Sequence, residues 1–315
     1  MSKVNEVRSA DVSSKEQSLG GVLPVIQTVF DENERIDIAG LDQELDWIAA
    51  QGADGLVTGM VSELIRLTES ERQLLTEVVT SAARRHGILS VISCGAESTV
   101  TAVAHAEHAA RHGANGVMAA PPLTVALSDD GIFEYYAALA KSTHLPIVVQ
   151  DASGYVGQSL SIAVQVRLLD TFGEQVYFKP EASPIGLRLT QLRDATSGHA
   201  RVFEGSGGAA LIDSYRRGIV GTMPGSEVCW AIRRLWDSAT AGNWQAAYEI
   251  SGPLNSLISL QTTIDSYVAV EKHLLARQGV IQSEHVRGPV GIRLDDETLA
   301  EVDRLFEHLE IVANR

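Results

Sequence analysis

The chain alternates short β-rich runs with longer stretches of helical spacing, and this alternation limits its possible folds more than any other feature. Stretches such as Leu41-Leu45-Ile48 and Val100-Val103-Ala104 repeat at helical spacing. Eight strand-then-helix units predict a closed parallel barrel, the (β/α)8 or TIM barrel of the α/β class. The expected strands are residues 22–26, 55–58, 88–92, 116–119, 147–150, 176–179, 201–204 and 219–223. The residues expected to cap helices at their start are Ser70, Ser98, Ser128 and Ser159.

A short glycine pattern recurs where an expected helix gives way to an expected strand. It reads Gly52-Ala-Asp-Gly55, Gly113-Ala-Asn-Gly116 and Gly218-Ile-Val-Gly221. Chance can produce such spacing in a chain with 27 glycines, but all three copies fall at the same kind of junction. The pattern therefore indicates a structural repeat, in which the first glycine ends a helix and the second begins a strand.

Three regions are expected along the chain. Residues 1–18 are polar and lack the apolar core of a signal peptide or membrane span, so we expect a disordered tail. Residues 19–240 supply the barrel, close to the length that this fold needs. Residues 241–315 are expected to form C-terminal helices packed on the barrel, at 246–260, 263–275 and 296–312, with a loop around Gly288-Pro289.

Composition excludes several classes of partner. The net charge of −15 argues against nucleic-acid binding, which requires a basic surface to neutralise phosphates. No apolar run reaches the roughly 18 residues needed to cross a bilayer, so no membrane association is expected. Cys94 and Cys229 are too few for a disulfide framework. We expect a cytoplasmic protein whose partner is a small molecule.

Lys179 stands at the end of the expected strand 176–179. Active sites of parallel barrels lie at the carboxyl ends of the strands, so this amine is expected at the catalytic mouth. Loss of hydration there lowers the pKa of a lysine and frees its lone pair to attack a ketone, which gives an imine. The alternative is a structural ion pair between Lys179 and Glu181 or Asp151.

His105, His108 and His112 are spaced to share one face of the expected third helix. A metal site is one interpretation of this spacing. Helix faces in a barrel lie outside the strands and away from the catalytic mouth, so we expect the three histidines to be structural. Neither a metal nor another cofactor is expected for the protein.

Several segments carry a resemblance to a known family. They are residues 21–30, Gly59-Met-Val-Ser-Glu63, Pro146-Ile-Val-Val149, Lys179-Pro-Glu-Ala-Ser183 and Arg287-Gly-Pro289. From about residue 21 to 305 the chain resembles the dihydrodipicolinate synthase and N-acetylneuraminate lyase superfamily, class I aldolases and dehydratases on an eight-fold barrel. The resemblance implies that Lys179 is the Schiff-base nucleophile, that the substrate is a 2-oxo acid, and that the chain forms a homo-oligomer, a tetramer or a dimer.

The chain departs from the family pattern at positions that touch substrate. Met60 and Val61 replace the hydroxyl residues of the second strand end, and Leu123-Thr124 replaces the paired tyrosines of the fourth loop. Gln150-Asp151 replaces the catalytic tyrosine and asparagine of strand five, and Tyr155 stands where an arginine usually follows. An amide cannot act as a general acid or base, so dihydrodipicolinate synthase activity itself is not expected.

Four features resemble the branch of the family that dehydrates 2-keto-3-deoxy sugar acids, such as 2-keto-3-deoxyarabonate. They are the pair Gln150-Asp151, the Lys179-x-Glu181 spacing, Gly205-x-Gly-Gly208 and Gly221-Thr-Met-Pro-Gly225. Lys179, Glu181 and Gln150 are the expected catalytic residues: the imine-forming amine, the acid or base, and an amide that orients a hydroxyl or water. The expected substrate-binding residues are Val61, Ser62, Asp151, Gly205, Ser206 and Met223.

Two alternatives remain from the sequence. Retro-aldol cleavage of a 2-oxo acid to pyruvate and an aldehyde uses the same imine, but with a base on the C4 hydroxyl. A non-catalytic ligand-binding relative would keep the barrel without turnover, although the presence of Lys179 argues against it. Glu181 could also be a surface carboxylate.

Overall fold

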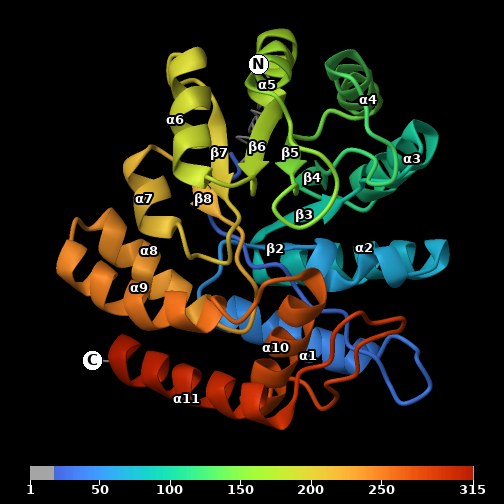
Figure 1. The fold of residues 1–315 in the computed structure, drawn as a ribbon. Helices are drawn as coiled ribbons and strands as arrows, with labels where there is room; N and C mark the ends of the chain where they lie inside the picture. Colours follow the sequence, from blue (N-terminus) through green and yellow to red (C-terminus); the bar gives the residue numbers. More distant parts are fainter. Residues whose placement is uncertain (1–17, 315) are drawn as a thin grey trace, which may run out of the picture.

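The computed structural model describes residues 18–314. The disordered tail expected at residues 1–18 therefore lies, apart from Ser18, outside the described part of the chain. Eight parallel strands pair in the order β1-β8-β7-β6-β5-β4-β3-β2, and a parallel bridge between Val25 and Val57 closes the ring. The predicted (β/α)8 barrel is confirmed (Figure 1). Its strands are β1 (Gly21–Val22), β2 (Gly55–Val57), β3 (Leu89–Ser93), β4 (Gly116–Ala119), β5 (Ile147–Asp151), β6 (Val176–Pro180), β7 (Arg201–Glu204) and β8 (Gly221–Thr222).

Strands β1 and β8 are shorter than the sequence predicted. Each spans two residues, whereas runs of five were expected at 22–26 and 219–223. Pro24 and Pro224 follow them closely and have no N–H to donate to the ladder, so the regular pairing stops there. The chains continue side by side beyond this point, because the Val25 N–H donates to the Pro224 carbonyl at 2.7 Å.

Helices follow the strands around the outside of the barrel. Ser98 and Ser128 cap α3 and α4 as expected, but Thr68 and Ser161, and not Ser70 and Ser159, cap α2 and α5. At α2 the Thr68 N–H donates to the Glu71 carboxylate at 2.8 Å, which completes a capping box. These helices are α1 (Ile38–Ala50), α2 (Glu69–His86), α3 (Thr99–Arg111), α4 (Asp129–Ser142), α5 (Ile162–Phe172), α6 (Ile185–Ala195), α7 (Leu211–Arg216) and α8 (Cys229–Thr240), with the short 3-10 helices η1 (Met60–Ser62), η2 (Leu64–Arg66) and η3 (Gly173–Gln175).

The repeated glycine junction has the expected geometry. Gly52, Gly113 and Gly218 have φ of 80°, 79° and 92°, a conformation that costs a glycine little. Each lies between a helix and the strand that follows. The repeat is thus structural.

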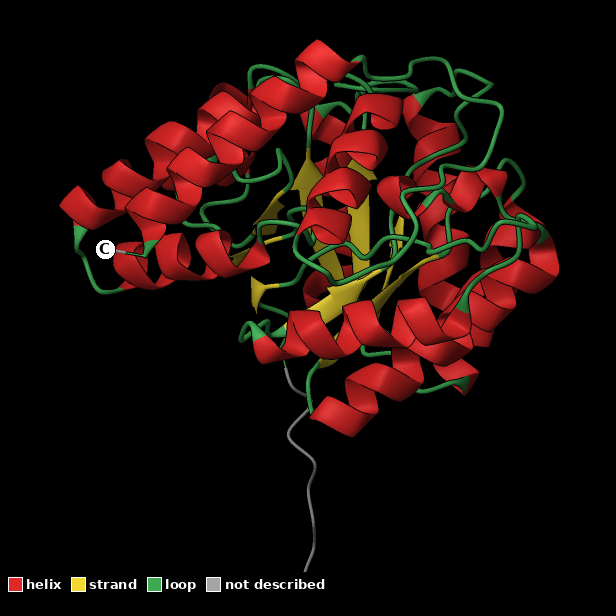
Figure 2. Ribbon diagram, turned by 90° about the horizontal axis from the view of Figure 1, so that it is seen from below, coloured by secondary structure: helices red, strands yellow, loops and turns green. Residues whose placement is uncertain are grey.

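Two separate apolar layers lie on the two faces of the closed sheet, one inside the barrel and one outside it. Inside the barrel, buried side chains such as Val57, Met118, Val148 and Tyr177 form one core. Helices surround the strands (Figure 2). A larger core of buried side chains lies between these helices and the strands. Alternate residues of a strand face these two layers in turn, so the inward register of each strand decides which side chain reaches the barrel mouth.

Three further helices follow the barrel, as the sequence predicted: α9 (Trp244–Ile258), α10 (Ile264–Arg277) and α11 (Asp296–Ala313). A third apolar core joins helices α7 to α11 to β1, with residues such as Ile232, Leu254 and Phe306. Helix α10 also lies against η1, in the loop after β2. Among residues 18–314, no helix is both long and apolar enough to cross a membrane.

Candidate active site

Lys179 points into the barrel from the carboxyl end of β6. Tyr177, two residues earlier, belongs to the inner core, whereas Val176 and Phe178 belong to the outer one. Alternation along the strand therefore directs the Lys179 side chain inward and upward to the mouth. Its side chain is 4% exposed. Of the other lysines in the described chain, Lys141 is exposed on the barrel surface and Lys272 is buried in an ion pair.

Glu181 and Gln150 surround the lysine amine. The Lys179 Nζ donates to Glu181 Oε1 at 2.8 Å, and the Gln150 Nε2 donates to Glu181 Oε2 at 2.7 Å. Gln150 is the direct neighbour of Lys179 across the β5–β6 ladder. Glu181 is buried, so the alternative of a surface carboxylate is wrong. Two donors hold this carboxylate beside the amine, and the three expected catalytic residues lie together.

These groups line a cavity at the barrel mouth that is open to solvent. Val61, Gly205 and Met223, which were expected to bind substrate, border it directly. Gly205 has a clear steric role, since a Cβ at this position would lie 2.8 Å from both Lys179 Cε and Glu181 Cγ. The cavity combines a few polar groups with an apolar lining, as is usual for sites that bind small molecules.

Ser62, Asp151 and Ser206 lie behind the cavity wall. The Ser62 hydroxyl donates to the Ile26 carbonyl at 2.5 Å and accepts the Gly59 N–H at 3.0 Å, so it fixes the loop after β2. Asp151 accepts the N–H groups of Ser153 and Leu160 at 3.1 and 2.9 Å, and so shapes the loop after β5. The Ser206 N–H and hydroxyl both donate to Glu204. All three residues support the loops that border the cavity.

The other side of the cavity is formed by residues that sequence reasoning did not select. Tyr155 comes from the loop after β5, and Ile264, Tyr267 and Glu271 come from α10. The hydroxyls of Tyr155 and Tyr267 are 3.4 Å apart. Ile264, Tyr267 and Glu271 are spaced to share one helix face. The available signal was an acidic residue, Glu271, within the apolar pattern of the expected helix 263–275.

Glu271 belongs to a group of buried carboxyl groups. Glu44 of α1 and Glu227 of the loop after β8 are buried with it, and Gln27 donates a side-chain hydrogen bond to Glu271. Burial raises the pKa of Glu44 and of Glu227 from 4.5 to about 7. Burial, together with the neighbouring Glu227 and Glu44, raises the pKa of Glu271 well above its ordinary value. Burial thus favours the uncharged, protonated form of Glu271.

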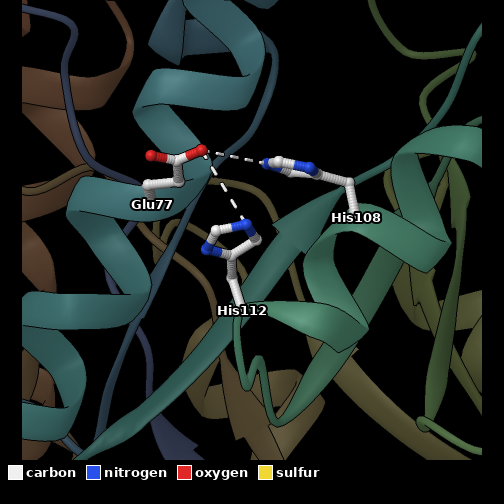
Figure 3. Close-up of side chains that lie close together, drawn as sticks. All are labelled: Glu77, His108 and His112. Carbon is white, nitrogen blue, oxygen red and sulfur yellow. Dashed lines mark ion pairs between the residues drawn. The ribbon is translucent and has the colours of Figure 1, made fainter.

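The histidines of α3 lie on the outside of the barrel, against α2. His108 and His112 each place Nε2 near Glu77 Oε1, at 3.7 and 3.8 Å, and Figure 3 shows the carboxylate pointing toward both rings. His105 lies near Glu69 instead, at 3.5 Å. The shared face is confirmed, and it pairs with acidic residues of α2. That the histidines bind no metal stays a prediction.

A buried lysine at a strand end of a parallel barrel is the arrangement in which an amine can form a Schiff base with a carbonyl substrate. Residues 18–309 match the model of the Dihydrodipicolinate synthetase family, and the chain belongs to this family. It is thus a class I lyase.

Two curated relatives and one solved structure illustrate the range of the family. The chain is 28% identical to an L-2-keto-3-deoxyarabonate dehydratase from Azospirillum brasilense, over 92% of this chain and 94% of the relative. It is 26% identical to a 4-hydroxy-tetrahydrodipicolinate synthase from Chlorobium luteolum, over 94% and 99%. A prophage protein of the dihydrodipicolinic acid synthase family from E. coli K12, solved in complex with pyruvate, superposes with a TM-score of 0.83 at 22% identity, over 92% and 98%.

Proposed function

We propose that the protein dehydrates a 2-keto-3-deoxy sugar acid, such as 2-keto-3-deoxyarabonate, with Lys179 as the Schiff-base nucleophile. The observation that carries this proposal is that Lys179, Glu181 and Gln150 lie together in one cavity. The Gln150 amide stands where the resemblance to dihydrodipicolinate synthases leads us to expect a catalytic tyrosine. The similarity to the Azospirillum brasilense dehydratase supports the same substrate class.

The geometry suggests a division of labour in the first steps. The Lys179 amine attacks C2 of the 2-oxo acid, and loss of water gives the iminium. The Glu181 carboxylate, 2.8 Å from Nζ, is placed to remove a proton from C3, next to the iminium carbon. The Gln150 amide holds the carboxylate and cannot itself exchange protons near neutral pH.

The substrate carboxylate is assigned to the loop after β2. Met60 and Val61 border the cavity at the first positions of η1, where backbone N–H groups have no helical carbonyl partner. Ser62 fixes this loop through its contacts with Gly59 and Ile26. The backbone N–H groups of Met60 and Val61 thus take the role of the hydroxyl side chains that the family carries at the end of the second strand.

Borohydride trapping tests the proposal. The protein is reduced in the presence of pyruvate or 2-keto-3-deoxyarabonate, and the adduct is located by intact mass and peptide mapping. An adduct on Lys179 is expected, because the other two described lysines are exposed or ion-paired. The K179A variant should lose both trapping and turnover, whereas the surface control K141A should keep both. No adduct in the wild type, or an adduct in K179A, would contradict the assignment.

Identification of the products formed from the sugar acid distinguishes dehydration from retro-aldol cleavage. Dehydration releases water and an unsaturated 2-oxo acid, whereas cleavage releases pyruvate and an aldehyde. Pyruvate among the products would overturn the proposed reaction while keeping the imine.

We also propose that the chain forms a homo-oligomer, as expected from the family resemblance. Light scattering of the purified protein measures the mass directly. A mass of 33.8 kDa, that of one chain, would contradict this proposal.

A further inference from the structure

The proposed dehydration requires an acid as well as a base. Expulsion of a hydroxyl group from C4 is slow unless its oxygen receives a proton as the bond breaks. Glu181 accepts a hydrogen bond from Lys179 and is placed to act as the base. A second group on the cavity wall has to supply the proton.

We propose that Glu271 of α10 is the general acid that protonates the leaving C4 hydroxyl. This inference rests on the proposed function. Glu271 borders the same cavity as Lys179 and Glu181, but it comes from the appended helix and not from a barrel strand. The cavity wall thus carries one carboxyl group from the barrel and one from α10.

The surroundings of Glu271 favour its protonated form and orient its carboxyl group. The Gln27 amide donates to Oε2, so Oε1 is the oxygen available to carry the proton. A Cβ added to Gly225 would lie 2.7 Å from Glu271 Oε1 and 2.3 Å from Glu227 Oε2. These two oxygens are therefore no more than 5.0 Å apart. Two buried carboxyl groups at this separation do not both ionise readily.

The tyrosines of the cavity are less suited to this step. Burial raises the pKa of Tyr267 to about 12, and it raises the pKa of Tyr155 further. A phenol of this kind gives up its proton less readily than a carboxylic acid, so it is the weaker acid at neutral pH. We assign Tyr155 and Tyr267 to hydrogen bonding with substrate hydroxyls.

The step balances with the groups present. Glu181 takes the C3 proton, and the electron pair of that bond forms the C2=C3 bond of an enamine while the iminium pair returns to nitrogen. The enamine then expels the C4–O bond pair, and the oxygen takes the Glu271 proton and leaves as water. Glu271 becomes a carboxylate, Glu181 is protonated, and one proton returned through solvent resets both. Hydrolysis of the conjugated iminium releases the unsaturated 2-oxo acid.

The E271Q variant tests the assignment, because glutamine keeps the shape and can still accept from Gln27. With the sugar acid, we expect turnover to fall at least 100-fold. With pyruvate, exchange of the methyl protons in D2O should stay within threefold of the wild type, because exchange needs the imine and a base but no leaving-group acid. E297Q, at an exposed glutamate of α11, is the matched control and should match the wild type in both assays.

A change of leaving group separates an acid from a positioning residue. The C4-fluoro analogue of the sugar acid expels fluoride, which depends less on protonation, so E271Q should lose less than tenfold with it. Retention of sugar-acid turnover by E271Q, or equal losses with hydroxyl and fluoride, would overturn the role of Glu271. Loss of pyruvate exchange by E271Q would assign it a structural role instead. A wild type that exchanges pyruvate but dehydrates no sugar acid would overturn the proposed function and, with it, this inference.

Discussion

Lys272 and Glu63 form an ion pair that is completely buried, with Nζ 2.5 Å from Oε1 and neither side chain exposed. The pair joins α10 to the loop after β2, so it holds Tyr267 and Glu271 opposite the barrel strands. Lys272 Nζ also donates to the His285 carbonyl at 2.6 Å, and the Arg287 N–H donates to Glu63 Oε2 at 2.9 Å. Glu63 thus fixes both α10 and the C-terminal loop.

Removal of one partner from this pair should destabilise the protein strongly. K272M removes the nearest cation of the buried Glu63 carboxylate and leaves Arg66, at 3.4 Å, as its remaining ionic partner. Loss of one partner of a buried pair typically costs roughly 3–5 kcal/mol. Urea unfolding at pH 7 measures the change. The E63Q/K272M double variant should lose less than the sum of the two single variants, because neither charge is then left unpaired. As a control, R85M removes an exposed pair with Asp42 and Asp46 and should cost less than about 1 kcal/mol. Equal losses in K272M and R85M would contradict the structural role of the buried pair.

Glu44 should make the folded protein less stable at higher pH. Its pKa is raised to about 7 in the folded state, against 4.5 for the ordinary group, because the side chain is buried. The unfolded chain therefore loses this proton first as pH rises above 4.5, and the contribution of Glu44 to stability decreases until about pH 7. The difference amounts to roughly 3 kcal/mol.

The E44Q variant isolates this contribution. Unfolding free energies of E44Q and the wild type are measured at pH 5 and pH 8, and the variant should gain relative to the wild type at pH 8. A constant difference between the two proteins at both pH values would show that Glu44 does not titrate in this range.

Gly205→Ala should impair catalysis more than folding. The added Cβ would lie 2.8 Å from Lys179 Cε and displace the amine, although φ at Gly205 suits other residues. We expect kcat/KM to fall at least tenfold with a small change in Tm. Gly252→Ala, within α9 and with no atom near the new Cβ, is the control and should stabilise by about 0.5–1 kcal/mol at full activity. Full activity in Gly205→Ala would contradict the steric role.

Removal of the Tyr155 hydroxyl should affect the sugar acid and not pyruvate. Tyr155 and Tyr267 hydroxyls lie 3.4 Å apart at the cavity, where pyruvate has no hydroxyl to meet them. Y155F should raise KM for the sugar acid about three- to tenfold, as expected for one lost hydrogen bond. Trapping with pyruvate and borohydride should be unchanged. An equal effect on both ligands would indicate that Tyr155 supports the cavity itself.

The barrel and its lysine were predictable because they depend on local patterns. The alternation of short β-rich runs with helical stretches predicts the strands, and position at or just after a strand end selects Lys179, Glu181 and Gln150 as candidate catalytic residues. Asp151 does end β5, and Ser62 lies in η1 after β2. Position near a strand end does not show whether a side chain turns to the cavity or to its own loop. The hydrogen bonds of Ser62 and Asp151 to nearby backbone groups direct them to the loop.

The contribution of α10 was not predictable from those patterns. Glu271 is 92 residues from Lys179 in sequence, and only the packing of α10 against η1 brings it to the cavity. The buried Glu44 gave a partial signal, since it lies between Leu41 and Leu45 on the apolar face of α1. A charged residue on such a face indicates an unusual environment but does not identify its partners.

Helix α10 lies outside the eight repeated strand-helix units, so the imine-forming residues and the residues proposed to contact substrate hydroxyls belong to different parts of the sequence. The amine and its neighbours belong to strands whose inward residues also fill the barrel core, so substitutions there disturb packing. Tyr267 and Glu271 belong to a helix whose removal from the barrel would leave the ring of strands closed. Mutations in α10 can therefore change which arrangement of substrate hydroxyl groups the cavity accepts while the eight strands stay unchanged. Directed evolution of the substrate range would best begin with a library at Ile264 and Tyr267.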